Sequence, residues 1–293
     1  MADAGANQVP FAVSGATGAV GGRVAARLAE SGHEQRLIVR DAGRAPDLPG
    51  SEVVEASYAD PKAMRRALEG ARTFFMVSAG EARDREEQHA AAVDAAVAAG
   101  VERIVYLSFL GAAPDATFTF ARDHWHTEEH VRSSGLRFAF LRDSLYLDFI
   151  PGLAGTDGVI RGPAGDGRVA AVARDDIADA AVAVLTGEGH DGRTHDLTGP
   201  EAITLQEAAW EISRAAGRLV TYHAETLEEA YASRSGYGAP GWEIEGWITS
   251  YAAIAAGEMD VVGDAVATLT RHQPMSLTDF LRRRPESYRC LLV

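Results

Sequence analysis

Three glycines at intervals of three residues follow a short apolar run near the N-terminus, in the stretch FAVSGATGAVGG over residues 11–22. Residues 11–13 are expected to form a buried strand and residues 24–28 the first turns of a helix, with the glycines in the loop between them. Alone, these glycines could mark an ordinary tight turn, but the order strand, glycine loop, helix is typical of dinucleotide-binding sheets. The stretch therefore favours an α/β chain that holds a dinucleotide.

Each glycine has its own task in such a loop. Gly15 permits the tight turn, Gly18 lets the backbone approach a pyrophosphate, and Gly21 lets the helix pack against the strand. The helix N-terminus offers N–H groups and about half a positive charge, so an anion is expected there. The first two glycines are three residues apart, unlike those of the G-x-G-x-x-G loop of simple dehydrogenases.

Apolar runs and helical patterns alternate over the first half of the chain. Strands are predicted near residues 11–14, 36–39, 52–55, 73–77, 103–108 and 137–142. Helices are predicted near residues 21–31, 61–69, 86–99 and 120–134. Strands separated by helix-length segments predict right-handed βαβ crossovers, and hence an α/β fold with a doubly wound parallel sheet between helices.

The pattern changes after residue 142. A glycine-rich loop is followed by a short strand at 168–172 and by helices near 175–185, 204–216, 226–234, 242–256 and 276–283. Thr204 and Glu207 form a capping box at the start of one of these helices. We therefore predict a dinucleotide-binding domain over residues 1–150, with 175–190 packing back on it, and a smaller, mostly helical substrate or lid region over 151–293.

An irregular stretch, SRSGYGAPGW over residues 233–242, interrupts the helical pattern of this second region. It is a candidate mobile loop over a pocket. Tyr237, Trp242 and Trp247 either line a flat aromatic pocket or are core residues, and the pocket is favoured because ligand sites gather aromatic side chains near irregular segments.

Charge and composition argue against several classes of binding partner and cellular location. The formal net charge of -14 and a pI near 5.1 argue against nucleic acid, whose binding depends on Lys and Arg. No run reaches the roughly 20 apolar residues of a membrane span, and residues 1–10, MADAGANQVP, lack the features of a secretory signal. A cytoplasmic protein is expected. The single cysteine, Cys290, can form no internal disulfide, and no neighbouring residue suggests a thiolate nucleophile.

The end of the second predicted strand bears on the choice of cofactor. An NAD site usually places Asp or Glu there, about 20 residues beyond the glycines, to bind the ribose 2′-OH. In this chain the run LIV ends in Arg40, and Arg44 follows in the same turn. Guanidinium groups pair with a 2′-phosphate, so NADP (NADPH) is favoured over NAD, although Asp41 lies beside Arg40.

Five stretches together carry a family resemblance: SGATGAVGG, LIVRD, VERIVYLSFLGA, GDGRVAAVARDDIADAA and LTGPEAITLQEAAWEIS. The chain resembles, over nearly its whole length, the NmrA-like atypical short-chain dehydrogenases, and within them the NADPH-dependent quinone oxidoreductase and triphenylmethane reductase branch. This resemblance implies a Rossmann fold and a reductase that acts on a small quinone or aromatic molecule. It leaves a homodimer open.

The resemblance also implies site residues. The pyrophosphate loop comprises Gly15, Ala16, Thr17, Gly18, Ala19, Val20 and Gly21. The 2′-phosphate is expected to bind Arg40, with Arg44 as a second cation. The residues that end the fourth strand and line the adenine-side ribose and the approach to the nicotinamide are Val77, Ser78 and Ala79. The residues that follow the sixth strand and border the nicotinamide and the substrate are Arg142, Asp143, Ser144, Leu145 and Tyr146.

The chain departs from ordinary short-chain dehydrogenases in its acid–base residues. Those enzymes use a Ser on the fifth strand, a Tyr as proton donor and a Lys four residues later. Ser108 occupies the Ser position, but Phe120 stands where the Tyr is expected and His124 where the Lys is expected. The candidate catalytic residues are thus Ser108, His124 and Tyr146. His124 is either a ribose anchor and proton relay or a buried core histidine.

One motif suggests different chemistry. HTEEH over residues 126–130 matches the H-x-x-E-H pattern of inverted zinc peptidases. No downstream carboxylate ligand is recognisable, and so short a motif arises easily by chance. We therefore interpret it as a solvated helix face and predict no metal site.

Three functions are consistent with these residues. The leading one is an NADPH-dependent reductase of quinones or similar conjugated aromatic acceptors, which accept hydride readily without strong general acid catalysis. A non-enzymatic dinucleotide sensor that binds a regulatory protein is also compatible with the missing Tyr and Lys. The third is a tailoring oxidoreductase that acts on an aromatic polyketide with the same cofactor.

Overall fold

The computed structural model describes residues 9–292 and divides them into two compact units. The first unit comprises residues 9–108, 123–142 and 177–195, and the second comprises residues 109–122, 143–176 and 196–292. The division is therefore not a single cut near residue 150, because the chain enters the second unit after the fifth strand and again after the sixth. Residues 1–8, which carry most of the stretch examined for a secretory signal, lie outside the described residues.

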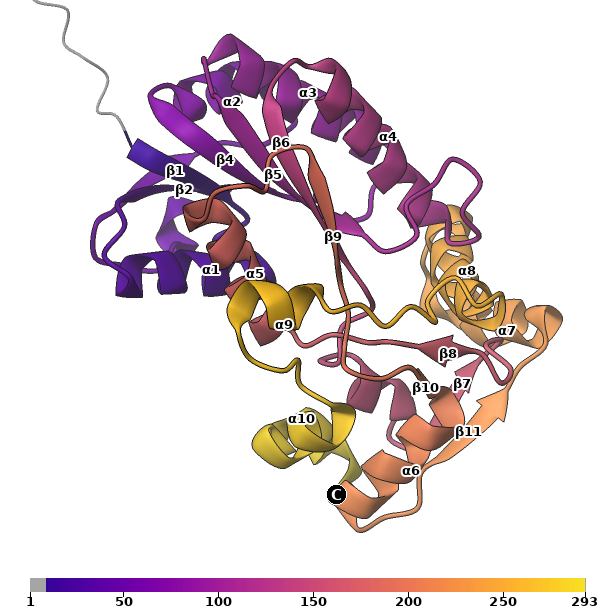
Figure 1. Cartoon of the computed structure of the whole chain (residues 1–293). Helices are drawn as coiled ribbons and strands as arrows, with labels where there is room; N and C mark the ends of the chain where they lie inside the picture. Colours follow the sequence, from indigo (N-terminus) through magenta and orange to yellow (C-terminus); the bar gives the residue numbers. More distant parts are fainter. Residues whose placement is uncertain (1–8, 293) are drawn as a thin grey trace, which may run out of the picture. The chain divides into compact units, whose positions relative to one another are not determined.

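A seven-stranded sheet forms the centre of the first unit (Figure 1), in the order β3-β2-β1-β4-β5-β6-β9. Its strands are β1 (Val9–Ser14), β2 (Gln35–Val39), β3 (Ser51–Glu55), β4 (Ala71–Val77), β5 (Arg103–Phe109), β6 (Arg137–Asp143) and β9 (Arg193–Leu197). β1 pairs in parallel with both β2 and β4, so the strand order reverses between β1 and β4. The predicted doubly wound α/β fold is confirmed, and β9 adds a strand that the sequence pattern did not predict.

Helices cover both faces of this sheet. They are α1 (Ala19–Glu30), α2 (Pro61–Leu68), α3 (Arg85–Ala98), residues 123–133 of α4 (Thr119–Ser133) and residues 177–186 of α5 (Arg174–Thr186). Figure 1 shows α2, α3 and α4 on one face and α1 and α5 on the other. Arg27 of α1 donates to Asp179 of α5 at 2.5 Å, which joins the two helices of the second face.

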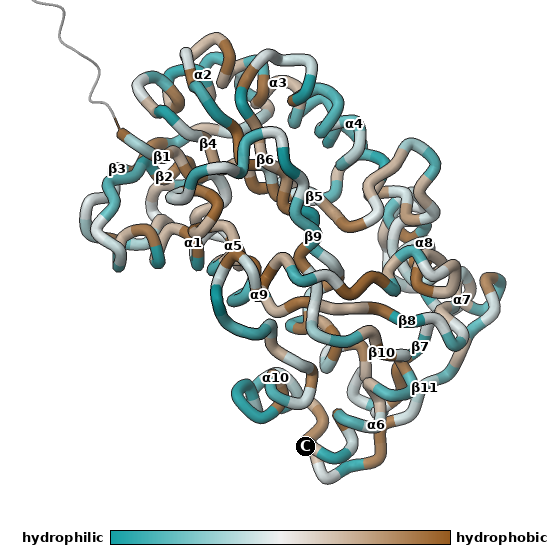
Figure 2. Tube along the Cα trace, viewed as in Figure 1, coloured by the Kyte–Doolittle hydropathy of each residue, from teal (hydrophilic) through white to brown (hydrophobic). Residues whose placement is uncertain are grey.

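The core of the first unit follows from the apolar runs of the strands and the apolar sides of the helices. Phe74, Ile104 and Phe140 from the sheet pack with Leu68 of α2 and Val93 of α3, all fully buried. Figure 2 shows brown, hydrophobic segments along the central strands, whereas much of α4 is hydrophilic. Burial of these apolar side chains is the main force that holds the helices on the sheet.

Local signals set the helix ends. Asp60 accepts hydrogen bonds from the backbone N–H groups of Lys62 and Ala63, and Pro61 is the first residue of α2. Such a cap satisfies donors that a helix start leaves unpaired. The capping box predicted for Thr204 and Glu207 is confirmed by its two reciprocal hydrogen bonds.

The second unit combines short strands and helices. They are η2 (Ile150–Ala154), β7 (Val159–Gly162), β8 (Arg168–Val169), β10 (Ile203–Thr204), α6 (Leu205–Ala216), β11 (Thr221–Ala224), α7 (Leu227–Arg234), η3 (Ser235–Tyr237), α8 (Gly241–Ala255), α9 (Ala265–Thr270), α10 (Leu277–Arg283) and η4 (Pro285–Leu291). β8 pairs antiparallel with β10, and β7 pairs in parallel with β11. The predicted helices are present, whereas β7, β10, β11 and α9 were not predicted.

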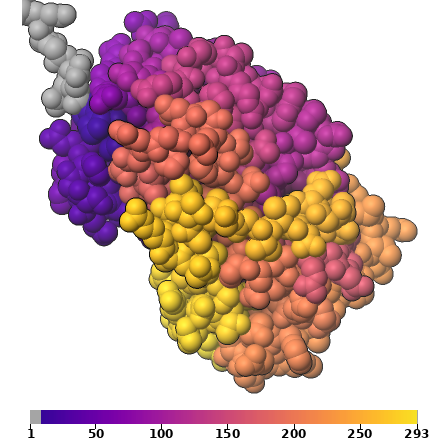
Figure 3. Space-filling model, in the orientation of Figure 1, coloured from indigo at the N-terminus to yellow at the C-terminus, as the bar shows by residue number. Residues whose placement is uncertain are grey.

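The C-terminal segment belongs to this unit. Leu277, Phe280 and Leu281 of α10 and Leu291 of η4 join the same buried cluster as Leu205 and Ile212 of α6. In the space-filling view the yellow C-terminal residues adjoin the orange residues around α6 (Figure 3). Within residues 9–292, no helix is both long enough and apolar enough to cross a lipid bilayer.

Candidate functional site

The carboxyl ends of β1 and β4 meet where the strand order reverses, which is where α/β sheets bind ligands. The Ser14 hydroxyl, at the end of β1, accepts the N–H of Val77 at 2.9 Å and lies 2.6 Å from the hydroxyl of Tyr58. Tyr58 donates in turn to the carbonyl oxygen of Val77 at 2.8 Å. These contacts join the two strand ends at the mouth of the crevice, and burial raises the pKa of Tyr58, which keeps its phenol protonated.

The glycine loop begins at Gly15, whose φ of 65° favours glycine. The Gly18 N–H donates to the Gly15 carbonyl at 2.8 Å, which closes the turn before α1. A Cβ on Gly21 would lie 2.4 Å from the Gly15 carbonyl oxygen, so the close packing of helix on strand requires glycine there.

Gly18 differs from the other two glycines. Its φ of -93° and ψ of 175° suit any residue, and a Cβ there would lie 3.1 Å from the Gly15 carbonyl oxygen. The first turn of α1 carries no acidic residue, so its N–H groups can meet an anion without a competing carboxylate. Of the other predicted loop residues, Thr17 and Ala19 are exposed, and Ala16 and Val20 are buried.

The end of β2 presents two cations. Arg40 and Arg44 are exposed, and neither forms an ion pair with any residue between 9 and 292. Asp41, which stood as the alternative partner for a ribose, instead accepts the N–H of Gly43 at 2.9 Å and caps the turn η1 (Ala42–Arg44). Both guanidinium groups are therefore available to a phosphate.

The segment after β4 is held by two buried side chains of α3. The N–H of Ala79 donates to Nε2 of His89 at 2.8 Å, and Nε of Arg85 donates to the carbonyl oxygen of Ala79 at 3.1 Å. Arg85 and His89 lie one helical turn apart and are 5% and 0% exposed. Both polar groups of the Ala79 backbone are thus fixed from the same side, next to Val77 and Ser78.

The protonation state of His89 follows from its partners. Because Nε2 accepts from the Ala79 amide, the proton of the neutral ring lies on Nδ1 and is donated to Thr127 of α4 at 2.8 Å. Burial, and secondarily the charge of Arg85, lowers the pKa of His89 to about 3. The ring is therefore neutral at physiological pH.

His124 is in the same situation. Its Nε2 lies 3.0 Å from Nη2 of Arg85, and its Nδ1 lies 2.8 Å from the hydroxyl of Tyr106. Burial, followed by the charge of Arg85, holds the pKa of His124 well below its usual range. The structure therefore places His124 in a buried position with a protein partner at each ring nitrogen. Its predicted part as ribose anchor or proton relay stays a prediction.

Ser108, at the end of β5, belongs to a second buried network. Its hydroxyl donates to Oε1 of Glu128 at 2.6 Å, and Arg142 donates to both carboxylate oxygens of Glu128 at 2.8 and 2.7 Å. Ser108 and Glu128 are both 0% exposed. The one proton of the Ser108 hydroxyl is thus directed at a carboxylate, and a contact of Ser108 with substrate stays a prediction.

Glu128 also belongs to the HTEEH motif, whose two histidines lie elsewhere. His130 pairs with Asp94 of α3 at 2.8 Å, and His126 lies 4.0 Å from Glu86. Each imidazole thus has a separate acidic neighbour on the outer side of α4. The interpretation of the motif as a solvated helix face therefore holds for His126, Glu129 and His130, whereas Thr127 and Glu128 of the same stretch are buried.

The remaining predicted residues belong to the second unit. Tyr146 donates to Oδ2 of Asp143 at 2.9 Å, and its ring lies 4.8 Å from the guanidinium carbon of Arg174. Ser144 is fully buried, and its hydroxyl has no hydrogen-bond partner in the described part of the chain. The carbonyl of Leu145 accepts the N–H of Val172.

Phe120 is a packing residue of the second unit. It is 7% exposed, and its ring centroid lies 6.1 Å from that of Trp242 in α8. A Cβ on Gly246 would lie 2.3 Å from the tip of this ring. Phe120, which the resemblance aligns with the catalytic Tyr of ordinary short-chain dehydrogenases, is therefore an apolar ring packed against α8 in this structure.

The aromatic residues of α7 to α8 divide between two environments. Tyr237 and Trp247 line a pocket of about 540 Å³ that lies within the second unit. Trp242 instead packs against Phe120. The irregular stretch between the helices is short, because α7 continues to Arg234 and α8 begins at Gly241.

Sequence reasoning did not find Tyr58, Arg85, His89 or Glu128. Arg85 and His89 share one face of a helix that directly follows a strand of the ligand-binding edge, and that spacing was the available signal. Glu128 was noticed only as part of a zinc-like motif. Its partnership with Arg132, four residues later on α4, was a second local signal.

Comparisons with known proteins agree with this geometry. A family model described as NAD(P)H-binding matches residues 15–188. The chain is 41% identical over 211 residues to a (4-alkanoyl-5-oxo-2,5-dihydrofuran-3-yl)methyl phosphate reductase of Streptomyces griseus, covering 70% of this chain and 73% of that protein.

Two solved structures cover nearly the whole chain. The NADPH complex of the quinone oxidoreductase QOR2 of Escherichia coli is 30% identical, with a TM-score of 0.87 over 93% of this chain and 99% of that one. The NADP(H) complex of triphenylmethane reductase from Citrobacter sp. is 30% identical, with a TM-score of 0.83 over 94% of this chain and 99% of that one.

Proposed function

This chain belongs to the NAD(P)H-binding family, and we propose that it uses NADPH to reduce a quinone or a similar conjugated aromatic acceptor. When bound, NADPH supplies a hydride. The glycine loop holds the pyrophosphate, and the Ala79 segment lies along the approach to the nicotinamide. The observation that carries the proposal is the pair of exposed arginines after β2, Arg40 and Arg44, which form no ion pair among residues 9–292, together with the start of α1, whose first turn has no acidic residue.

The preference for NADPH rests on Arg40 and Arg44. A 2′-phosphate on the ribose finds two guanidinium groups there, and charge-assisted hydrogen bonds to such groups are about twice as strong as neutral ones. One oxygen of Asp41, Oδ1, accepts the Gly43 amide, which ties this carboxylate to the η1 turn. The related structures of QOR2 and triphenylmethane reductase hold NADPH and NADP(H), which supports the same choice.

We base the choice of acceptor on the acid–base residues. The positions that supply a proton in ordinary short-chain dehydrogenases carry no strong general acid in this chain. Phe120 has no ionisable group, and His124 is neutral with its Nδ1 proton directed at Tyr106. A ketone needs a proton delivered as hydride arrives, whereas a quinone accepts hydride as a stabilised anion and can take its proton from water. The arrangement therefore favours an activated acceptor, and the family's quinone and dye reductases support it.

Oxidation of NADPH tests this function. With 1,4-benzoquinone, absorbance at 340 nm should fall steadily, while cyclohexanone and 2-propanol with NADP should give no reaction under the same conditions. Rates should rise with the reduction potential of the quinone. Rapid reduction of simple ketones would contradict the proposed mechanism.

The same assay separates the enzyme from a dinucleotide sensor. A sensor binds NADPH tightly, as calorimetry would show, yet gives no turnover with a broad panel of quinones. That outcome would replace the reductase with the regulatory function. Turnover confined to polyphenolic polyketides would instead indicate a tailoring enzyme.

A further inference from the structure

The second unit contains its own pocket, of about 540 Å³, among η2, β7, α7, η3 and α8. This volume lies in the range of small-molecule sites, roughly 300 to 1,000 Å³. All of its lining residues come from this unit, so the pocket lies wholly within it.

The apolar walls of the pocket are mostly aromatic. Tyr237 and Trp247 have ring centroids 6.3 Å apart at an interplanar angle of 51°, and Tyr251 and Leu153 add further apolar surface. Gly152 contributes no side chain, and a Cβ there would have nothing within 4 Å. The pocket therefore has open space beside aromatic rings, which suits a flat aromatic molecule.

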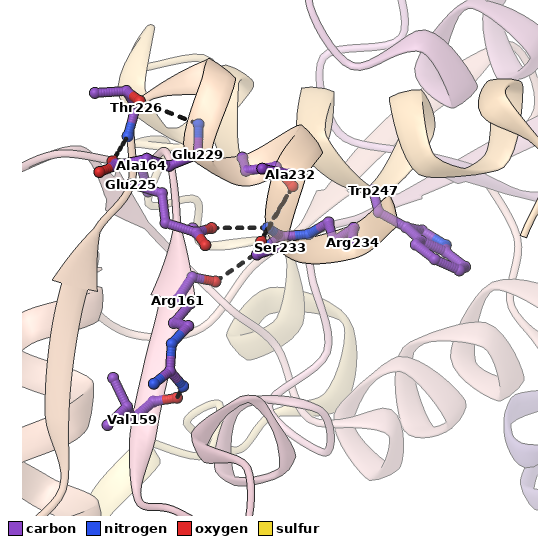
Figure 4. Close-up of polar contacts among 12 residues, drawn as sticks. Val159, Arg161, Ala164, Glu225, Thr226, Glu229, Ala232, Ser233, Arg234 and Trp247 are labelled. Carbon is purple, nitrogen blue, oxygen red and sulfur yellow. Dashed lines mark hydrogen bonds and ion pairs between the residues drawn. The ribbon is translucent and has the colours of Figure 1, made fainter. Parts of the chain in front are cut away.

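A buried arginine forms the polar side of the pocket. Arg234 is 7% exposed, and its Nη1 donates to Glu225 at 2.7 Å while its Nη2 donates to the carbonyl oxygen of Arg161 at 3.1 Å (Figure 4). Its guanidinium carbon lies 5.5 Å from the centroid of the Tyr251 ring. The guanidinium plane is thus fixed by β7, by α7 and by Glu225, which directly follows β11, and it does not depend on a ligand for its position.

The charge of the lining has one sign. Arg161 and Arg234 line the pocket, and no Asp or Glu does. Each arginine pairs with a carboxylate outside the lining, Arg161 with Asp157 and Arg234 with Glu225. These carboxylates offset part of the positive charge, but a ligand in the pocket meets the guanidinium groups directly. A neutral or anionic ligand meets cationic and hydrogen-bonding groups there, whereas a cationic ligand meets two guanidinium groups without a facing carboxylate.

We propose that this pocket binds a flat aromatic molecule of about two or three fused rings, neutral or anionic, and that it discriminates against aromatic cations. The inference goes beyond the proposed hydride transfer, because it concerns binding within the second unit alone. Tyr237 is 67% exposed and its hydroxyl has no hydrogen-bond partner among residues 9–292, so it is available to an oxygen of the ligand. The rings hold the ligand by stacking, and the guanidinium groups select its charge.

Calorimetry with the full chain tests this proposal with two probes of the same three-ring frame, anthraquinone-2-sulfonate and N-methylacridinium. The wild-type chain should bind the sulfonate at least about tenfold more tightly than the cation. Arg161→Gln should lower the affinity for the sulfonate by a factor of about two to five, as expected for a half-exposed charge. The affinity for the cation should stay the same or rise. Equal affinity for the two probes, or no binding of either, would overturn the proposal.

Two matched pairs of variants locate the site. Gly152→Leu, which fills the open space, should weaken the sulfonate about tenfold or more, whereas Gly241→Leu, at an equally open glycine outside the pocket, should not. Tyr237→Ala should weaken it about twofold to tenfold, whereas Tyr231→Ala, at another exposed tyrosine, should not. If neither Gly152→Leu nor Tyr237→Ala changes the affinity for the sulfonate, the probe binds elsewhere and the proposal is wrong. Because these measurements use no NADPH, failure of the proposed reductase activity would leave them interpretable.

Discussion

Nη2 of Arg85 donates a hydrogen bond to Nε2 of His124 at 3.0 Å, deep between α3 and α4. An arginine can only donate, so Nε2 carries no proton and His124 is neutral, with its proton on Nδ1. The same guanidinium group donates through Nε to the carbonyl oxygen of Ala79. His124 thus contacts Arg85, which holds the segment beside the crevice, and we predict that it is a positioning residue for that segment.

The first prediction concerns this contact. His124→Ala should lower kcat/KM for quinone reduction by about tenfold or more, equivalent to about 1.4 kcal/mol or more, because Arg85 loses an acceptor and Ala79 is held less firmly. Stability should fall by about 1–3 kcal/mol, since a buried donor is left unpaired. Steady-state kinetics and denaturant unfolding measure the two effects.

His126→Ala is the matched control, because His126 lies on the same helix but is half-exposed. It should change neither kinetics nor stability appreciably. A folded His124→Ala variant with wild-type kcat/KM would show that the Arg85 contact does not support turnover.

The second prediction concerns pH. His89 has a pKa of about 3 in the folded chain and about 6.5 when unfolded, so below pH 6.5 the unfolded state binds more protons. Its contribution to stability is therefore full above pH 6.5 and is lost as the pH falls toward 3, at up to about 1.4 kcal/mol per pH unit.

Urea unfolding between pH 7 and pH 4.5 measures this slope. His124, whose pKa is also depressed, should add a second proton to it. His89→Gln should reduce the slope by about one proton, or about 1.4 kcal/mol per pH unit. A free energy of unfolding that does not change over this range would be inconsistent with two buried neutral imidazoles.

The third prediction separates two glycines of the loop. Gly18→Val should fold but fail to bind NADPH, because the backbone at Gly18 accepts any residue while its Cβ would occupy the space of the pyrophosphate. Gly21→Ala should instead destabilise the chain by about 1–3 kcal/mol, since its Cβ meets the Gly15 carbonyl. Circular dichroism and calorimetry distinguish the two. Near-normal NADPH affinity in Gly18→Val would remove the loop from this role.

The fourth prediction concerns cofactor preference. Arg40→Ala should lower the affinity for NADPH by roughly tenfold to a hundredfold, because a hydrogen bond to a charged group contributes about 1.5–3 kcal/mol. The affinity for NADH should change little. Arg66→Ala serves as the control, since Arg66 is an exposed arginine of the same unit and its loss changes the net charge equally. If Arg40→Ala weakens both cofactors alike, Arg40 is a structural residue.

Much of the fold could be predicted from the sequence. The six predicted strands and the four predicted helices of the first half lie within a few residues of β1 to β6 and α1 to α4, because period-two and period-3.6 patterns report local burial. β9 escaped prediction, since its sequence RTHDL is mostly polar and its strand form depends on its place in the sheet. In the second unit β8 was predicted, whereas β7, β10 and β11 escaped prediction because each has only two to four residues.

The sequence by itself determined the glycine loop and the arginines after β2, because each follows from residue type at a fixed local spacing, and the family resemblance alone implied the missing phenol at Phe120. Only the tertiary structure decided what His124 and Ser108 contact. Arg85 and His124 lie 39 positions apart, and Ser108 and Glu128 lie 20 apart, so no local pattern connects them. A buried polar group needs a hydrogen-bond partner, and the packing of segments that are distant in sequence decides which partner is within reach. That packing brings His124 to Arg85 and Ser108 to Glu128.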